Sequence, residues 1–249
     1  MIVLKTSGEL ERMREACRLS AQALQVGLDA VKPGVTTWDI DRKIHDFITS
    51  HGAKPSFLGY GGFPGSACIS INEQVIHGIP SRERVIQEGD VVSIDVGAFY
   101  KGYHGDNAGT VGAGEISPEA RQLLEVTQQC LYDGIAAAVV GNRIGDIGAA
   151  VEARATRYGY GVVREYVGHG VGANLHEDPE VPNYGRAGHG PRLTSGMTIA
   201  IEPMINMGTE MVRVLKDKWT VVTADGKPAA HFEHTVAITD NGPVILTRP

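Results

Sequence analysis

The sequence predicts an α+β fold made of two similar halves, each with two helices followed by a strand. Three observations support this prediction: capping patterns open amphipathic segments, short alternating runs indicate strands, and the chain matches itself at one fixed offset. The 249 residues, of which 42% are hydrophobic, can bury a substantial core. We expect one domain over residues 1–249, with halves at roughly 1–112 and 113–249.

Two helices are expected in the first half of the chain. Residues 6–9 (TSGE) have the order of a capping box, and apolar residues then recur at helical spacing until the Pro-Gly pair at 33–34. Glycine and proline commonly follow the end of a helix, so the first helix should stop before them. Residues 36–39 (TTWD) form a second capping box, and the helix that it opens should end at Gly52.

Two further helices are expected in the second half. Ser117 is a favourable N-cap, and Pro118 suits the first helical position because its missing N–H is not needed there. This helix should stop near Gly141, and a fourth should run from about residue 142 to residue 159.

A shift of 107 residues superimposes the second helix pair on the first without a gap. Between residues 14–52 and 121–159, 10 of 39 positions are identical, where ordinary composition would give about two or three. The same shift places EGDVVSID over SGMTIAIE, and therefore Asp95 over Glu202. Chance similarity between helices would not preserve one shift across a later strand. We interpret the match as an ancient duplication, whose halves face each other about a pseudo-twofold axis and bring both carboxylates near it.

Two aspartates lie in the run VVSIDVGAFYKGYHGDNAGTV, which alternates like two strands around a short turn. Asp95 and Asp106 are symmetric about the point between residues 100 and 101, so in a regular hairpin they should face each other, with Cβ atoms about 5 Å apart. Like charges in that arrangement repel, and a cation between them would relieve the repulsion. Alternatively, a bulge at Gly102 or Gly105 would turn one aspartate to solvent.

Two glutamates lie beside apolar runs. Glu202 ends the run MTIAIE and Glu233 opens the run FEHTVAIT, both typical of buried strands. A buried carboxylate must be paired or bound to a metal to offset the loss of hydration.

The glycine-rich stretch EYVGHGVGANLHEDPE allows three interpretations. GHGVGA matches a dinucleotide-binding fingerprint, but the prolines that follow exclude the helix which that motif requires. His176 and Glu177 match the start of a zinc-protease HExxH motif, but Glu180 occupies the place of the second histidine. The flanking glycines of His169 let the backbone bring the imidazole close to a charged group, and we favour His169 as a metal ligand.

The candidate metal site therefore combines four carboxylates with one imidazole. Four negative charges balance two divalent cations, and oxygen-rich ligands suit Mn²⁺ or Fe²⁺ better than a structural zinc site. Two such ions can share a water, lower its pKa and stabilise an oxyanion, which is hydrolysis chemistry. The expected ligands are Asp95, Asp106, His169, Glu202 and Glu233.

These residues resemble the type I methionine aminopeptidases of bacterial style, which have the pita-bread metallopeptidase fold. The resemblance rests on five blocks in the same order: CISINEQVIHGIP, IDVGAFYKGYHGD, YVGHGVG followed by His176 and VPNY, AIEPMI, and FEHTVAIT. It implies a single catalytic domain with a curved, mainly antiparallel sheet and helices on its outer face. It also implies a hydrolase that removes the initiator methionine from nascent proteins and peptides by metal-activated water attack on the first peptide bond, with a preference for a small second residue.

The resemblance also implies roles for individual residues. The five ligands would hold two divalent ions (Mn²⁺, Fe²⁺, Co²⁺ or Zn²⁺), with Asp106 and Glu233 bridging them. Glu202 would also shuttle the proton of the bridging water. His77 would contact the scissile peptide and steady the intermediate, and His176 would hydrogen-bond the substrate carbonyl or nitrogen.

An apolar slot for the methionine side chain is implied as well. A flexible thioether suits such a slot because sulfur makes favourable contacts with aromatic rings. Gly61, Gly97 and Leu175 depart from what many relatives carry: a histidine, a threonine and an aromatic residue respectively. The slot residues implied are Tyr60, Phe63, Cys68, Leu175 and Trp219.

Composition limits the remaining classes of function. The formal net charge of −6 argues against direct nucleic-acid or anionic-membrane binding, and no segment is apolar enough for a membrane span or signal peptide. Three cysteines without CxxC spacing suit a reducing compartment. We expect a cytoplasmic monomer that acts on nascent polypeptide N-termini, with the ribosome as one place of encounter.

Three alternatives remain open. The first is a prolyl aminopeptidase or prolidase on the same fold, although such enzymes usually carry a large N-terminal domain. The second is a catalytically dead relative that binds peptides, although all five proposed ligands are present. The third is a redox enzyme built on Cys68 and His77. The other cysteines and histidines are assigned to structure or surface: Cys17, Cys130, His45, His51, His104, His189, His231 and His234.

Overall fold

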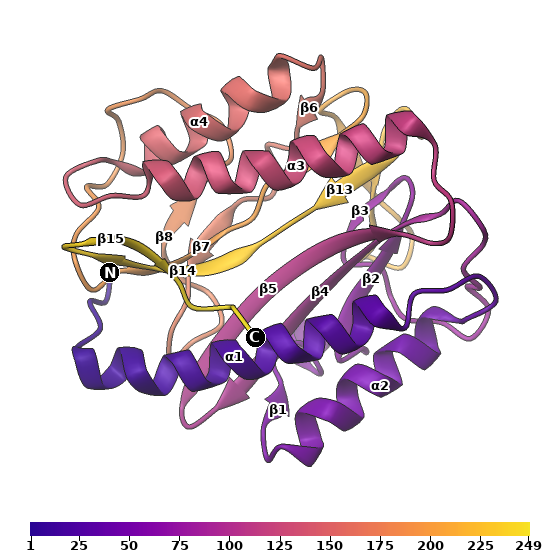
Figure 1. Cartoon of the computed structure of the whole chain (residues 1–249), viewed down its shortest axis with the longest axis horizontal. Coiled ribbons are helices and arrows are strands. Elements are labelled where there is room, and N and C mark those ends of the chain that lie inside the picture. Colours follow the sequence, from indigo (N-terminus) through magenta and orange to yellow (C-terminus); the bar gives the residue numbers. More distant parts are fainter.

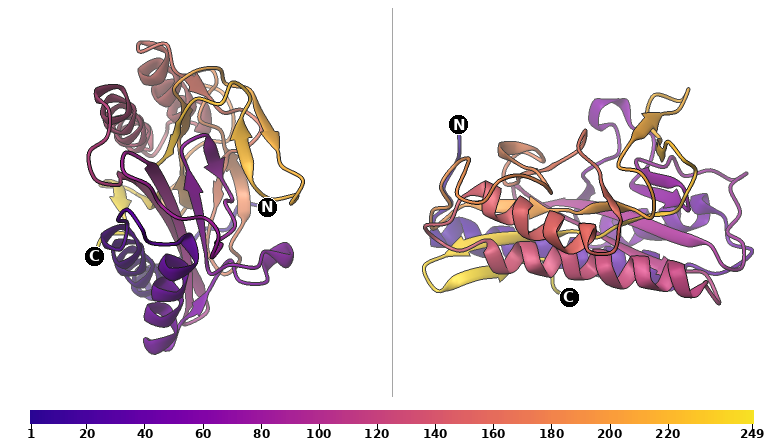
Figure 2. Two further views of the ribbon diagram at one scale, coloured as in Figure 1. Left: turned by 90° about the vertical axis from the view of Figure 1, so that its right-hand side faces the viewer. Right: turned by 90° about the horizontal axis from the view of Figure 1, so that it is seen from above.

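The structure, a computed structural model, describes residues 1–249 and contains two pairs of helices that cover one side of antiparallel sheets (Figure 1). The left view of Figure 2 shows both helix pairs on one side of the strands. None of the helices is both long and apolar enough to cross a bilayer. The helices are α1 (Ser7–Asp29), α2 (Thr37–Ser50), α3 (Pro118–Ala137) and α4 (Ile144–Thr156), with a short 3-10 helix η1 (Tyr60–Gly62).

The four predicted helices are confirmed, with small differences at their ends. Thr6 and Thr36 each accept a hydrogen bond from the backbone N–H three residues on, and each capping box is complete. Ser117 caps α3 in the same way, with Pro118 at the first helical position. Helix α3 ends at Ala137, earlier than expected, so a turn separates it from α4.

All strand pairs are antiparallel, as the fold class predicted. One sheet has the order β1-β4-β2 with β5 paired to β4, and another has the order β15-β14-β9-β7-β8. Two three-stranded sheets, β13-β10-β6 and β11-β12-β3, complete the structure. The strands are β1 (Lys54–Pro55), β2 (Ala67–Ile71), β3 (Gln74–Ile76), β4 (Val91–Tyr100), β5 (Tyr103–Gly112), β6 (Gly161–Val162), β7 (Gly168–Gly170), β8 (Glu177–Val181), β9 (Thr198–Ile201), β10 (Met204–Asn206), β11 (Val212–Val214), β12 (Val221–Thr223), β13 (Ala229–His231), β14 (His234–Thr239) and β15 (Gly242–Ile245).

The internal repeat is visible in the packing of the helices. Helix α4 begins 107 residues after α2 (144 − 37), and β9 begins 107 residues after β4 (198 − 91). A Cβ atom added at Gly27 would lie 2.7 Å from Cδ1 of Ile44, and one added at Gly134 would lie 2.9 Å from Cγ2 of Val151. These four residues also match at the 107-residue shift. Each half therefore packs its two helices through the same close contact.

The β4–β5 hairpin has a different register from the one expected. Tyr100 pairs with Tyr103, and the turn consists of Lys101 and Gly102, with φ values of 50° and 86°. A two-residue turn of this kind needs positive φ at both central positions, and glycine at the second position favours it. Asp95 therefore pairs with Ala108, and the predicted face-to-face pairing of Asp95 with Asp106 was wrong.

The two aspartates are instead diagonal neighbours on one face of the hairpin. Asp106 pairs with Gly97, two residues along β4 from Asp95, and residues two apart in a strand point to the same face. The pairing runs without a register shift, so the alternative of a bulge that turns one aspartate to solvent was also wrong. Both carboxylates still reach the same side of the sheet.

Replacing Gly105 with alanine should destabilise the protein by roughly 2 kcal/mol or more, because α1 lies directly against β5 there. The added Cβ would lie 2.4 Å from Cα and 2.6 Å from the backbone N of Cys17, atoms that cannot move without shifting the helix. Urea unfolding measures the effect. The matched control is Gly8→Ala, because nothing lies within 4 Å of a Cβ at Gly8. Equal free energies of unfolding for the two variants would contradict this packing.

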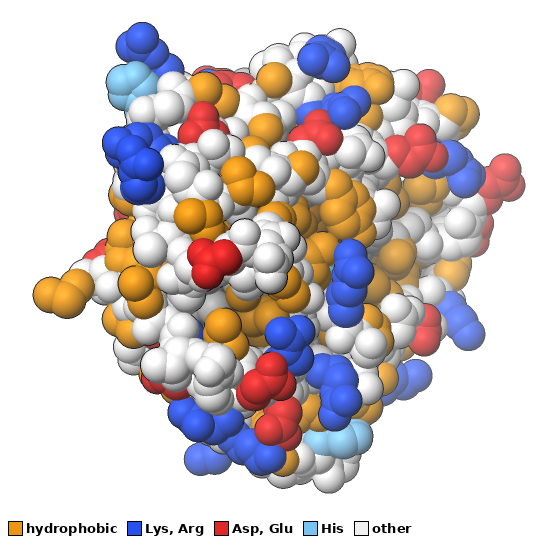
Figure 3. Space-filling view, turned by 60° about the vertical axis from the view of Figure 1, so that its left-hand side comes forward, with side chains coloured by type: hydrophobic (Ala, Val, Ile, Leu, Met, Phe, Trp, Pro, Cys, Tyr) orange, Lys and Arg blue, Asp and Glu red, His pale blue; other side chains and the backbone are white.

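The surface carries charges of both signs. On the face shown in Figure 3, Lys and Arg side chains lie among Asp and Glu side chains and apolar groups, without one extended basic area.

Candidate metal centre and active site

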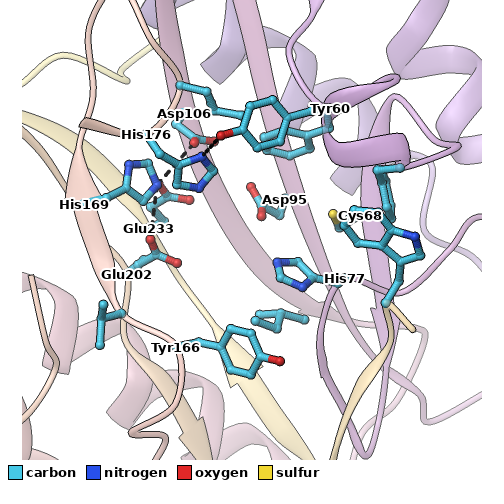
Figure 4. Close-up of a pocket in the computed structure, with 16 residues that line it drawn as sticks. Tyr60, Cys68, His77, Asp95, Asp106, Tyr166, His169, His176, Glu202 and Glu233 are labelled. Atoms are coloured by element: carbon cyan, nitrogen blue, oxygen red, sulfur yellow. Dashed lines mark hydrogen bonds and ion pairs between the residues drawn. The ribbon is translucent and has the colours of Figure 1, made fainter. Parts of the chain in front are cut away.

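A cavity of about 200 Å³ contains all twelve side chains that the sequence singled out as site residues. Asp106, His169, Glu202 and Glu233 gather on one side of it, Cys68 and His77 lie on the other, and Asp95 lies between the two groups (Figure 4). Four further residues, which the sequence did not single out, also line the cavity: Phe57, Ile76, Tyr166 and Val167. They are apolar or aromatic residues near predicted ones, and only their position in space identifies them.

The proposed metal ligands come from both halves of the chain. Asp95 and Asp106 lie on β4 and β5, and His169 lies on β7. Glu202 follows β9, and Glu233 lies between β13 and β14. Side-chain atoms of Asp106, His169 and Glu233 lie within 4.8 Å of one another. The distances from Nε2 of His169 are 3.5 Å to Oε1 of Glu202 and 3.8 Å to Oδ2 of Asp106.

Backbone contacts between the halves hold the ligands in place. The hydroxyl of Thr235, on β14, donates to the carbonyl of Asp106 at 2.8 Å and accepts from its N–H at 3.2 Å. The N–H of Glu233 donates to the carbonyl of Ala108 at 3.0 Å. Strand β5 and the start of β14 are thereby joined beside the carboxylates, so two ligands from different halves keep a fixed separation.

The carboxylates have the properties expected of unsatisfied metal ligands. Asp106 and Glu233 are buried, and three carboxylate oxygens, one each from Asp95, Asp106 and Glu233, lack any hydrogen-bond partner. Burial raises the pKa of Asp95 to about 7 and the pKa of Glu202 to about 8. Burial, followed by repulsion from neighbouring carboxylates, raises the pKa of Asp106 and Glu233 well above their usual values. Buried oxygens that repel one another and lack donors fit divalent cations.

His169 is prepared to bind a metal through Nε2. Its Nδ1 lies 2.8 Å from the carbonyl oxygen of Gly170, so Nδ1 carries the proton and the Nε2 lone pair faces the carboxylates. Burial lowers the pKa of this imidazole to about 3, so the ring is neutral. The flanking glycines are required by the neighbouring strands: a Cβ at Gly168 would lie 2.3 Å from the carbonyl oxygen of Ala200, and one at Gly170 would lie 2.2 Å from that of Asp178.

The two proposed substrate-contacting histidines lie at different edges of the cavity. Nδ1 of His176 lies 2.8 Å from the hydroxyl of Tyr60, and the two rings are stacked with centroids 5.2 Å apart. His77 has a φ of 58° and meets the rings of Tyr166 and Trp219 edge-on. Burial lowers the pKa of His77 to about 4, which keeps it neutral. Both histidines can therefore offer a neutral N–H or a lone pair to a bound peptide.

The apolar end of the cavity is a small cluster of its own. Phe57, Phe63, Cys68 and Leu175 are buried together, with Trp219 packed against them. Gly97 makes room for this cluster, because a Cβ there would lie 2.8 Å from Cε1 of Phe57.

His231 is a residue whose position the sequence interpretation missed. We assigned it to structure or surface, but its Nε2 lies 3.5 Å from Oε2 of Glu202 and has no hydrogen-bond partner. It stands two residues before Glu233, at the end of β13. Alternation along that segment was the signal that would have placed both side chains on the same side.

Comparisons with known proteins agree with this geometry. Residues 11–240 match the model of metallopeptidase family M24. The chain is 56% identical to a methionine aminopeptidase of Clostridium acetobutylicum, over 99% of each chain. It is 51% identical to methionine aminopeptidase 1 of Bacillus subtilis, over the full length of both.

Solved structures show the same relationship. The crystal structure of methionine aminopeptidase from Thermotoga maritima matches with a TM-score of 0.98 and 45% identity, over 100% of both chains. A prolidase from Pyrococcus furiosus matches with a TM-score of 0.80 and 26% identity, over 99% of this chain but only 66% of the prolidase. These matches confirm the pita-bread fold and the resemblance stated above. The chain belongs to metallopeptidase family M24 and, within it, to the methionine aminopeptidases.

Proposed function

We propose that this protein removes the N-terminal methionine from nascent proteins and peptides, with a preference for a small second residue. The observation that carries the proposal is the convergence of four carboxylates and one neutral imidazole beside an apolar slot. The carboxylates would hold divalent ions, and the slot would hold an unbranched apolar side chain.

Asp95, Asp106, His169, Glu202 and Glu233 would hold two divalent ions. Bound in this way, the ions supply an acidified water and positive charge for the oxyanion that follows. Glu202 would take the proton of the attacking water and deliver it to the leaving amine.

The histidines would position the substrate. His176, fixed by the hydroxyl of Tyr60, would hydrogen-bond the carbonyl or nitrogen of the first peptide bond. His77 lies across the cavity from His176 (Figure 4). It would stabilise the oxyanion by donating a hydrogen bond from the N–H of its neutral ring. The rings of Phe63 and Trp219 would contact the methionine sulfur, which favours aromatic edges.

Three tripeptides test the proposed function. The protein is stripped of metal, Mn²⁺, Fe²⁺, Co²⁺ or Zn²⁺ is added back, and free amino acid is followed from Met-Ala-Ser, Met-Leu-Ser and Ala-Pro-Ala. We expect metal-dependent release of methionine from Met-Ala-Ser, with kcat/KM roughly 100-fold higher than for Met-Leu-Ser. Cleavage of Ala-Pro-Ala alone would contradict the proposal and indicate a prolyl peptidase.

We also propose that the protein meets nascent chains in the cytoplasm, as they leave the ribosome, and that it acts as a monomer. Three buried cysteines without a disulfide suit a reducing compartment. The net charge of −6 does not favour direct contact with RNA.

A further inference from the structure

Glu202 lies between two imidazoles, and the proposed function uses only one of them. Nε2 of His169 lies 3.5 Å from Oε1 of Glu202, and Nε2 of His231 lies 3.5 Å from Oε2. Each oxygen of the carboxylate therefore faces its own ring nitrogen. His169 lines the cavity with the other proposed ligands, whereas His231 does not.

His231 is held in place from several directions. Its side chain is almost fully buried, with the whole residue 1% exposed. The hydroxyl of Thr110 donates to the carbonyl of His231 at 2.7 Å and accepts from its N–H at 3.0 Å. His231 also pairs with Met204 in the β10–β13 ladder. With its backbone fixed on both sides, the ring has little freedom to turn away from Glu202.

The orphaned nitrogen of His231 needs a partner. A buried ring nitrogen without a hydrogen bond costs free energy, and here the nearest charged acceptor is Oε2 of Glu202. When Oε1 of Glu202 faces a metal ion beside His169, Oε2 is left as a buried oxygen that needs a donor. A neutral imidazole can carry its single proton on Nε2 and supply that donor. Each group therefore meets the requirement of the other.

We propose that His231 is a positioning residue: its Nε2–H donates a hydrogen bond to Oε2 of Glu202 and holds this carboxylate oriented toward the metal site. The inference rests on the proposed function, since it assigns His231 to the same centre. The separation of 3.5 Å is long for a hydrogen bond, and it would shorten as Glu202 turns to bind metal. Ligand atoms of Glu202, His231 and Glu233 also lie within 4.8 Å of one another, so direct binding of His231 to a metal is the alternative that the experiment must separate from a hydrogen bond to Glu202.

Removing a residue that hydrogen-bonds a metal ligand usually lowers metal affinity or activity by about 10- to 100-fold. His231→Leu keeps an apolar group of similar size and removes the donor. His231→Gln keeps a donor, because the glutamine amide reaches nearly as far as Nε2. The control is His45→Gln, since His45 lies on α2 and bonds Ser66 away from the site.

The experiment measures Mn²⁺ binding to the metal-stripped proteins by calorimetry, and kcat and KM for Met-Ala-Ser with the loaded proteins. We expect His231→Leu to lose about 10- to 100-fold in Mn²⁺ affinity or in kcat, with KM nearly unchanged. We expect His231→Gln and His45→Gln to stay within about threefold of the parent protein, a margin well inside that range. If the leucine variant does not fold, His231→Asn replaces it, because its shorter amide should fail to reach Glu202.

Two results would overturn the inference. Parent-like metal binding and turnover by His231→Leu would mean that Glu202 needs no donor. Equal losses in His231→Gln and His231→Leu would mean that the imidazole itself is required, as in direct metal binding. The metal titration does not depend on the peptide chosen. A parent protein that releases no methionine would contradict the proposed function. A loss of Mn²⁺ affinity in His231→Leu that is absent in His231→Gln would still support the hydrogen bond.

Discussion

Replacing Glu202 with glutamine should lower kcat for Met-Ala-Ser by about a thousandfold, while the protein stays folded. Glutamine has the same shape and can still place an oxygen beside Nε2 of His169, which now lies 3.5 Å from Oε1. It cannot accept a proton from water or deliver one to the leaving amine. General acid–base catalysis by a placed side chain typically contributes about 10²- to 10⁴-fold, so the loss should fall within that range.

The matched comparison is a substitution at His77, which contacts substrate in the proposed mechanism but does not bind metal. Asparagine is the better replacement, because His77 has a φ of 58° and asparagine tolerates this conformation. His77→Asn should slow turnover and leave Mn²⁺ binding close to that of the parent. Steady-state kinetics and calorimetry on the three proteins separate the two effects. Normal turnover by Glu202→Gln would show that another group moves the proton.

The duplication was the part of the fold that the sequence predicted best. A single offset of 107 residues is preserved in the sequence, and in the structure it aligns the start of α4 with that of α2 and the start of β9, which Glu202 follows, with that of β4, which carries Asp95. Helix ends are marked by local chemistry, such as the hydroxyl of Thr36 or the proline at 118, and such signals act over a few residues. Helix ends can therefore be predicted from a few neighbouring residues, without knowledge of the rest of the chain.

Strand register was harder, because it depends on a turn rather than on composition. The symmetry of Asp95 and Asp106 suggested one pairing, but the conformational demand of a two-residue turn placed Gly102 at its second position. Because the turn lies one position later than expected, Asp95 and Asp106 are diagonal neighbours and not a directly opposed pair. The functional conclusion survived, since a shift that preserves the face keeps both carboxylates together.

His231 could not be interpreted from the sequence for a different reason. A histidine in a strand is most often structural, and the local signal, its position two residues before Glu233, indicates a shared side of the chain but not a contact with Glu202. Its significance comes from Glu202, which lies 29 residues earlier (231 − 202) and approaches through the β10–β13 pairing. Contacts between segments of that separation become visible only when the sheet is assembled. The same holds for Phe57 and Tyr166, which join the cavity from loops.

Removing the metals should abolish hydrolysis and make the protein less stable as pH rises from 6.5 to 8.5. Asp95 and Glu202 have folded-state pKa values of about 7 and about 8 because burial disfavours their charged forms. Unfolded, they would titrate near 4. At pH 6.5 the folded protein therefore holds protons that the unfolded chain has released. These protons are lost as pH rises through 7 and 8, and their stabilising contribution is lost with them.

The size of the effect follows from the number of protons involved. Each retained proton changes the free energy of unfolding by about 1.4 kcal/mol per pH unit, so the two groups should remove roughly 2–3 kcal/mol between pH 6.5 and 8.5. Asp106 and Glu233 act in the same direction. The buried histidines act in the opposite direction, because burial lowers the pKa of His77 to about 4 and of His169 to about 3. At pH 6.5 each such histidine is still half protonated in the unfolded chain, so its opposing contribution fades between pH 6.5 and 7.5 and offsets about 0.4 kcal/mol of the loss.

Bound Mn²⁺ should remove this carboxylate dependence, because metal binds only the ionised carboxylates, which the unfolded chain also carries ionised in this pH range. Urea unfolding of stripped and Mn²⁺-loaded protein at pH 6.5, 7.5 and 8.5 measures both slopes. Glu202→Gln provides the internal check: it removes one titrating carboxyl group, so its metal-free slope should be shallower than that of the parent. A stripped protein equally stable at pH 6.5 and 8.5 would mean that the carboxylates are ionised without metal. In that case the charges at this centre would have to be offset by groups other than the ions.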